Sequence, residues 1–531
     1  MIGVDDLVEA RARSVAGDWS AAAELWGRVV EANPVHGTHW WRLAEARVAS
    51  DDVAGALVAY ERVAELGAWD GPATPFPAEV AHRIAQCRAR LGDVDGAFDA
   101  LRSALELGFR DLGVLATDPH LAALRRDERW PLPTARTRAD DLDLFAREVK
   151  RRAFRHTSFD AEVGRLRQRV DHLSDAELLV ELSRLVATLG DGHARVEPPA
   201  DRADLHLAIP VRLDHFADGV FVTAAAPEHA DLLGAEVLAC DGVDLDLVLA
   251  RVEEIVSRDN AYGALAGVMR KLPRTAVLHA LGIAEHADRM TLRLRSADGS
   301  VAETTVPARP ISKEQADARP CPPEWRFLLS PPLPLYLRNV AAPYWYVDQP
   351  DDDLLYVQIN SVSDDPAEPF DAFVSGLFAD LARRAPRRLV VDLRWNEGGN
   401  TFLTMPLLHR LIAYAGEIFV VIGRHTLSAA QNLSTLIAHH TPALFVGEPT
   451  GSSPNFVGET APFELPHSRF QVNVSDLYWQ TSWPMDHRTW LPPDIYTPPT
   501  FAAYARNQDP ALDAIRAYPR QTRPSYATRT P

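Results

Sequence analysis

The sequence predicts a multidomain chain that is α-helical at its N-terminus and α/β toward its C-terminus, with a small β module between them. Three patterns predict this class: a helical segment that repeats itself, short alternating strands bounded by turns, and apolar strands that alternate with amphipathic helices. The length of 531 residues exceeds what one hydrophobic core normally serves, so several domains are expected.

The first expected domain, residues 1–125, repeats one helical pattern three times. Equivalent positions hold Asp18, Asp52 and Asp93, followed four residues later by Ala22, Ala56 and Ala97. The first two copies are 34 residues apart, and a turn-rich insert, AWDGPATPF, precedes the third. This pattern resembles the tetratricopeptide repeat, in which an alanine allows two helices to approach closely. The resemblance implies a concave surface for a peptide or protein partner, while a spacer or a dimer contact is the alternative.

Residues 140–200 are expected to form a helical part, after a proline- and charge-rich linker at 127–141. Its clearest helix carries apolar residues at helical spacing and ends near Gly190. Those residues are Leu178, Leu182, Leu185 and Leu189.

Residues 205–310 show short alternating strands with turn signals and predict a β module. The stretch LLGAEVLACDGVDL, residues 232–245, resembles a turn of PDZ-like modules, which bind chain termini as an added edge strand. Many small β modules share such a turn.

Residues 335–520 alternate strands with helices and predict an α/β core with buried parallel strands. The strands are expected at 354–360, 388–394, 418–422 and 443–447. Three clusters fall at strand ends, where α/β proteins place their sites. They are DLRWNEGGN (392–400), the strand-to-helix corner at Ser428, and the loop VGEPTGSSPNFVGE (446–459).

Together with LGDGH (189–193) and the C-terminal LPPDIYTPPTFAAYARNQDPALDAI, these clusters resemble the tail-specific (C-terminal-processing) and tricorn-core serine peptidases. The resemblance spans about residues 140–520. It implies a crotonase-like α/β catalytic core, a PDZ-like or related β insert and a helical N-terminal part. By this resemblance Ser428 is the nucleophile, and Gly398, Gly399 and the amide of Ala429 form the oxyanion hole. A simple helix N-cap is the alternative role for Ser428.

The general base is expected to be a histidine. Processing peptidases use a lysine that follows the nucleophile, but the three lysines of this chain are Lys150, Lys271 and Lys313, so none follows Ser428. The tricorn-like branch uses a histidine from the helical part, and His193 of the DGH motif fits that position. His425, three residues before Ser428, is the rival base.

Two features of this resemblance stay open. The candidates for a carboxylate that orients the histidine are Asp191, Glu459 and Asp494. Many relatives carry glutamate three residues after the nucleophile, whereas this chain has Gln431, which indicates either a subgroup preference or a weakened site.

Composition excludes some other functions. A formal net charge of −18 argues against nucleic acid as the main partner. The three cysteines lie far apart and give neither a disulfide framework nor metal-ligand spacing. No signal peptide and no stretch that could span a bilayer is evident, so a cytoplasmic location is the default expectation.

The sequence therefore predicts a serine-type peptidase that needs no metal or organic cofactor and acts on peptides or unfolded chains. One alternative is a non-catalytic ligand- or peptide-binding protein on the same fold. Another is a scaffold that acts only through the repeats.

Overall fold

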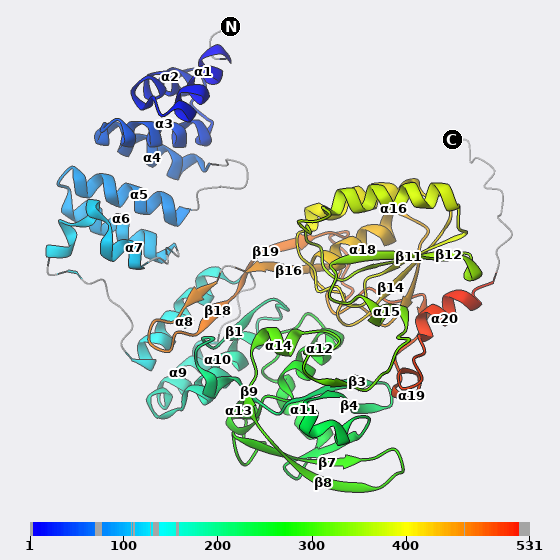
Figure 1. The fold of residues 1–531 in the computed structure, drawn as a ribbon. Coiled ribbons are helices and arrows are strands. Elements are labelled where there is room, and N and C mark those ends of the chain that lie inside the picture. Colours follow the sequence, from blue (N-terminus) through cyan, green and yellow to red (C-terminus); the bar gives the residue numbers. More distant parts are fainter. Residues whose placement is uncertain are drawn as a thin grey trace. The chain divides into compact units, whose positions relative to one another are not determined.

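In the computed structural model the chain forms two compact units, Met1–Ala135 and Arg136–Pro531 (Figure 1). The structure describes residues 4–68, 77–107, 109, 112–127, 129–130, 137–154, 159–460 and 462–519. Most of the turn-rich insert and much of the expected linker lie outside these ranges. In the described part of the chain, no helix is long and apolar enough to cross a membrane.

The first unit consists of successive helices. These are α1 (Val4–Ala16), α2 (Trp19–Ala32), α3 (Gly37–Ala49), α4 (Val53–Leu66), α5 (Pro77–Arg90), α6 (Val94–Glu106) and α7 (Leu112–Thr117).

The expected repeat is visible in the local geometry of this unit. Asp18, Asp52 and Asp93 directly precede α2, α4 and α6, with φ of −83°, −82° and −81°. The three equivalent alanines, Ala22, Ala56 and Ala97, are each 0% exposed. The three copies therefore share one conformation and one buried helix contact.

The second unit begins with three helices: α8 (Arg138–Arg152), α9 (Asp160–Arg167) and α10 (Asp175–Ala187). The sequence predicted a linker over residues 127–141, but residues 137–141 form the N-cap and first turn of α8. Thr137 and Asp140 form a capping box that starts α8, and Asp141 is fully buried where its carboxylate accepts a 2.7 Å hydrogen bond from the Ser468 amide. In α10, the predicted leucine face is buried.

A β module follows, with the strand order β10-β4-β5-β7-β8, β3 pairing with β4 and β6 with β5. All of these pairs are antiparallel. The strands are β3 (Val211–Phe216), β4 (Gly219–Ala225), β5 (Glu236–Cys240), β6 (Val243–Asp244), β7 (Arg289–Arg295), β8 (Val301–Pro307) and β10 (Arg326–Phe327). The helices α11 (Leu245–Glu253), α12 (Ala261–Lys271) and α13 (Thr275–Ala280) join β6 to β7.

The α/β core is a six-stranded sheet of order β11-β12-β13-β14-β15-β20. From β12 onward each neighbour is parallel, and only β11 is antiparallel. The strands are β11 (Tyr344–Gln349), β12 (Leu354–Ile359), β13 (Arg388–Asp392), β14 (Glu417–Ile422), β15 (Leu444–Gly447) and β20 (Ile495–Tyr496). The sequence predicted β12 to β15 close to their observed bounds.

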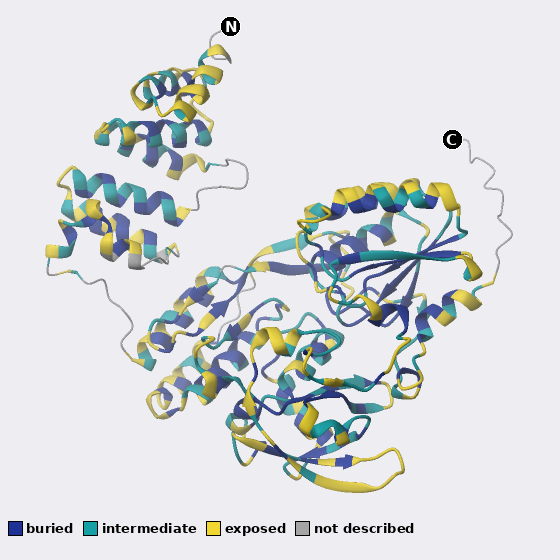
Figure 2. Cartoon of the chain, in the orientation of Figure 1, coloured by how far each residue is buried: buried dark blue, intermediate teal, exposed yellow. Residues whose placement is uncertain are grey.

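Helices cover both faces of this sheet and bury its strands (Figures 1 and 2). The helices α16 (Phe370–Arg384), α17 (Met405–Ala413) and α18 (Ala429–His440) pack on one face. The helix α20 (Pro510–Ala517) packs on the other through Leu512 and Ile515.

A long hairpin leaves the core and reaches the helical part, and the sequence patterns did not predict it. Its strands are β16 (Asn455–Thr460) and β19 (Ser475–Gln480), which pair antiparallel. Between them, β18 (Gln471–Asn473) pairs with β1 (Arg195–Glu197), the strand that follows the DGH motif. This pairing joins two segments that lie far apart in the chain.

Candidate active site

Ser428 lies at the sharp corner between β14 and α18. Its backbone has φ 53° and ψ −123°, a left-handed conformation that a non-glycine residue rarely adopts. Its side chain makes no capping hydrogen bond to α18. The N-cap alternative for this hydroxyl is therefore wrong, and the strain at Ser428 is not explained by capping.

Polar groups of neighbouring loops fix this corner. The Leu427 amide donates to the Asn396 carbonyl at 3.1 Å, and the Asn396 side chain donates to the Ile359 carbonyl at 3.0 Å. The fully buried Thr426 hydroxyl donates to the Leu393 carbonyl at 2.9 Å. Asn396 and Thr426 thus hold Ser428 beside the glycine loop, and sequence reasoning gave neither a role.

The glycine pair after β13 packs directly against Ser428. Gly398 has φ 108°, and a β-carbon placed on it would lie 2.5 Å from Ser428 Cβ and 2.9 Å from the Ala429 nitrogen. Gly399 has φ 135°, and a β-carbon there would collide with the Val362 carbonyl at 2.0 Å. Both positions therefore require glycine.

Of the three backbone amides around Ser428, one already donates a hydrogen bond and two have no recorded acceptor among the described residues. The Gly398 amide donates to Asn396 Oδ1 at 2.9 Å, so it is already occupied. For the amides of Gly399 and Ala429, no acceptor is recorded within residues 159–460. Two backbone donors are thus free next to the Ser428 side chain, which is the arrangement needed to stabilise an oxyanion.

His193 belongs to a loop that is anchored on the long hairpin. The Asp191 carboxylate accepts hydrogen bonds from the His193 amide at 2.9 Å, the Ser475 amide at 3.0 Å and the Ser475 hydroxyl at 3.0 Å. The imidazole of His193 stacks on Phe456 of β16, with ring centroids 5.4 Å apart. Its Nδ1 is buried and has no hydrogen-bond partner among the described residues.

The three expected orienting carboxylates lie elsewhere. Asp191 binds the backbone of its own loop and Ser475, as above. Glu459 is exposed, and Asp494 is exposed where its carboxylate accepts from the Phe445 amide at 2.8 Å. No contact of these groups with the imidazole is recorded in the described part of the chain.

Asp259 is a carboxylate on which the charge of His193 acts, and the sequence analysis gave it no role. It directly precedes Asn260, the N-cap of α12, its Oδ1 accepts the Gly192 amide at 2.9 Å, and its Oδ2 is buried without a hydrogen-bond partner among the described residues. Burial raises its pKa, while the charge of His193 and the bond from Gly192 oppose that shift. The only signal in the sequence was its place before Asn260, whose side chain caps α12.

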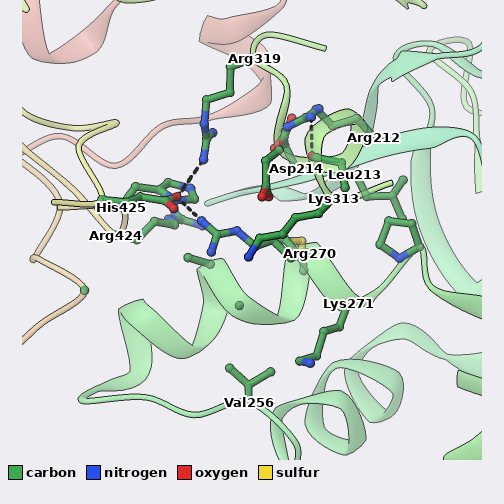
Figure 3. Close-up of a pocket in the computed structure, with 18 of the residues that line it drawn as sticks. Arg212, Leu213, Asp214, Val256, Arg270, Lys271, Lys313, Arg319, Arg424 and His425 are labelled. Atoms are coloured by element: carbon green, nitrogen blue, oxygen red, sulfur yellow. Dashed lines mark hydrogen bonds and ion pairs between the residues drawn. The ribbon is translucent and has the colours of Figure 1, made fainter. Parts of the chain in front are cut away.

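His425, the rival base, is bound to the motif that carries the glycine pair. Its Nδ1 lies 3.0 Å from Glu397 Oε1, and Glu397 also pairs with Arg270 and, at 3.1 Å, with Arg319. Figure 3 shows Arg270 and Arg319 pointing toward His425. Burial, followed by the charge of Arg319, lowers the pKa of His425 to about 4. At neutral pH this imidazole is uncharged and engaged with Glu397.

A cavity of about 1190 Å³ extends from this region between the β module and the core. His193, Asp259, Glu397, His425 and Leu427 all line it. Among the described residues, no group of three or more His, Cys, Asp or Glu side chains could hold a metal ion. The imidazoles and carboxylates that line the cavity can act as general bases and in hydrogen bonds.

Two neighbouring residues are engaged close to the site. Arg394 pairs with Asp392 at 2.8 Å and with Asp509 at 3.0 Å at the end of β13. Gln431 is buried on α18, where its side-chain nitrogen donates to Thr435 and its oxygen has no partner among the described residues.

Solved structures with this fold include mature CPAF, alone and complexed with lactacystin. The structure of mature CPAF complexed with lactacystin aligns with a TM-score of 0.55 at 14% identity, covering 72% of this chain and 97% of that chain. Mature CPAF alone aligns with a TM-score of 0.54 at 14% identity, covering 72% and 96%. The photosystem II D1 C-terminal processing protease aligns over 71% of this chain and 99% of that one, at 14% identity and a TM-score of 0.36.

No protein-family model and no curated protein sequence matches the chain. At identities this low, the CPAF likeness establishes a shared fold. The relationship to the tail-specific peptidases that the motifs indicate stays a prediction.

Proposed function

We propose that this chain is a serine peptidase in which Ser428 attacks the carbonyl carbon of a peptide bond. The observation that carries the proposal is the strained, uncapped Ser428 side chain packed against Gly398, with the free amides of Gly399 and Ala429 beside it. A strained strand-to-helix corner of this kind exposes a nucleophile and places helix N-terminal amides near it.

In the first step His193 removes the proton of the Ser428 hydroxyl as the oxygen attacks the carbonyl carbon. The amides of Gly399 and Ala429 stabilise the negative oxygen of the tetrahedral intermediate. His193 then gives its proton to the leaving amine, and the acyl group stays on Ser428. Water, deprotonated by the same imidazole, attacks the ester carbon, and the ester bond breaks to release the second product as a carboxylic acid. His193 returns the proton to the Ser428 oxygen.

Asp259 takes the role of positioning residue for His193 in this proposal. A carboxylate near Nδ1 selects the tautomer whose Nε2 can accept a proton, and it stabilises the imidazolium that forms. The buried unpartnered Oδ2 of Asp259 and the buried unpartnered Nδ1 of His193 support this assignment. Asp191, Glu459 and Asp494 have other positions and are not assigned this role.

The repeat unit, which we take to be tetratricopeptide-like, would bring a partner or a substrate to the peptidase. Peptides or unfolded chains are the proposed substrates, and the β module is proposed to be PDZ-like.

Digestion of an unfolded protein mixture, read by mass spectrometry, tests the proposed function. Wild-type protein should generate new peptide termini, whereas Ser428→Ala should generate none above background. Wild-type protein that binds peptides tightly and leaves them intact would instead identify a non-catalytic binding protein.

A further inference from the structure

Basic side chains from several elements line the cavity beside the candidate active site. Among them are Arg212 from β3, Arg270 and Lys271 from the last turn of α12, Arg274 before α13, and Arg319 from the segment before β10. This set is called the cationic wall below. In a chain with a formal net charge of −18, such a cluster runs against the composition.

Two carboxylates near the cationic wall are each shared between two cations. Glu397 is shared by Arg270 and Arg319, and Glu197 is shared by Arg195 and Lys313. Asp214 and Asp317 add one charge each near Arg319 and Arg274.

Three members of the wall have no carboxylate partner in the described part of the chain. Arg212 donates to the carbonyls of Ala316 and Ala318, and its Nε is buried without an acceptor. Arg274 donates to the Ile311 carbonyl at 3.1 Å. For Lys271 no hydrogen bond or ion pair is recorded, and in Figure 3 its ammonium group has no dashed contact.

The pKa of Lys271 is lowered because its ammonium group is buried near other positive charges. Burial, followed by the positive charge of Arg274, lowers its pKa to about 8, and Glu197 offsets this shift only in part. Burial also lowers the pKa of Arg274 and of Arg319. An anion placed beside Lys271 and Arg274 would stabilise the charged forms of both.

The wall is connected to the reacting groups through the chain itself. Arg270 and Arg319 hold Glu397, which directly precedes the Gly398 that packs on Ser428. Leu427, next to Ser428, lines the same cavity. A peptide bound at Ser428 can therefore extend along the cavity past these cations.

We propose that Lys271 and Arg274 of the cationic wall bind a carboxylate of the substrate peptide. The ligand is thus an acidic peptide, whose carboxylate accepts hydrogen bonds from the Lys271 ammonium and the Arg274 guanidinium. This inference rests on the proposed peptidase function for its kinetic readout, while binding itself can be measured without catalysis.

The test uses peptides that differ only in a glutamate or a glutamine, placed in turn at each position flanking the cleaved bond. Each peptide is made with a free and with an amidated C-terminus. At one position the glutamate peptide should show a kcat/KM about tenfold higher than its glutamine partner, the size expected for charge-assisted hydrogen bonds. Retention of the preference in the amidated peptide assigns it to the side chain, and its loss assigns it to the terminal carboxylate.

Variants locate the effect. Lys271→Met should bring the glutamate-to-glutamine ratio close to one, and Lys271→Arg should retain most of it. Lys150→Met, a matched change of an exposed lysine on α8, should leave the ratio at its wild-type value. An equal rate for glutamate and glutamine peptides at every position, or an undiminished ratio in Lys271→Met, would overturn the inference.

A binding assay separates this inference from the proposed function. Fluorescence anisotropy with Ser428→Ala protein measures the affinity for the glutamate and glutamine peptides without cleavage. Preference for glutamate without any cleavage by wild type would retain the carboxylate site and reject the peptidase. Cleavage by wild type without any preference for glutamate would retain the peptidase and reject the carboxylate site.

Discussion

The conformation of Ser428 is the residue-scale feature from which the chemistry follows. A serine with φ 53° is held there by the surrounding loops, through Asn396, Thr426 and the close contact with Gly398. Strain of this kind persists only where the surrounding structure determines it, and it clusters at functional sites. The strained backbone of Ser428 therefore lowers the free energy of unfolding at the position that holds the hydroxyl.

Ser428→Gly should raise the free energy of unfolding by about 1 kcal/mol relative to Ser428→Ala, because glycine adopts positive φ without strain. Urea denaturation of the two variants measures this difference. Both variants lack the hydroxyl, so the comparison isolates the backbone. Equal stability would show that the corner is not strained.

Asp259→Asn should lower kcat by roughly 10²-fold or more if Asp259 orients His193. The free energy of unfolding should rise at the same time, because burial raises the pKa of Asp259 and the amide removes a buried charge while keeping an oxygen for the Gly192 amide. Steady-state kinetics and thermal melts of one preparation report both. A variant that loses stability and activity together would indicate a merely structural role.

At the scale of elements, the long hairpin connects the loop that carries His193, the proposed base, to the α/β core that carries Ser428. The β1–β18 pairing and the Asp191–Ser475 bonds hold the DGH loop on a segment that follows α18 in sequence. The ring of Phe456 of β16 stacks on the imidazole of His193. The position of His193 is thus set by the hairpin, not by its own helix.

Asp191→Ala should lower the free energy of unfolding by roughly 2–4 kcal/mol, because it leaves buried donors of Ser475 without their acceptor. Chemical denaturation measures the loss. Asp201→Ala is the control, since that carboxylate pairs with Arg469 at an exposed position and should change stability by less than about 1 kcal/mol. Comparable losses in the two variants would contradict the anchoring role of Asp191.

The sequence predicted those elements whose apolar period is regular. The strands β12 to β15, the leucine face of α10 and the repeated Asp and Ala positions of the first unit follow from local pattern. Non-local contacts gave no such signal. The pairing of β1 with β18 and the approach of Asp259 to Gly192 depend on segments many residues apart, so local patterns did not predict them.

At the scale of the whole molecule, buried neutral histidines occur in both units. Burial lowers the pKa of His39 in the first unit and of His425 in the second to about 4. An unfolded histidine takes up its proton near pH 6.5, before either folded group does. Acid therefore favours the unfolded state of each unit.

Stability should fall as the pH drops from about 6.5 toward 4, by up to about 3 kcal/mol for each of these histidines. Melting temperatures measured between pH 7 and pH 4.5 test this, and His39→Gln should flatten the dependence of the first unit. A melting temperature that stays constant over this range would contradict the assignment of both groups as neutral.

The most direct test of the central claim is the rate at which a fluorophosphonate probe labels the protein, with the modified residue mapped by mass spectrometry. The account predicts one adduct, on Ser428, whose formation slows at least about 100-fold in His193→Ala and is absent in Ser428→Ala. Absence of an adduct on Ser428 in correctly folded wild-type protein, or an unchanged rate in His193→Ala, would contradict it.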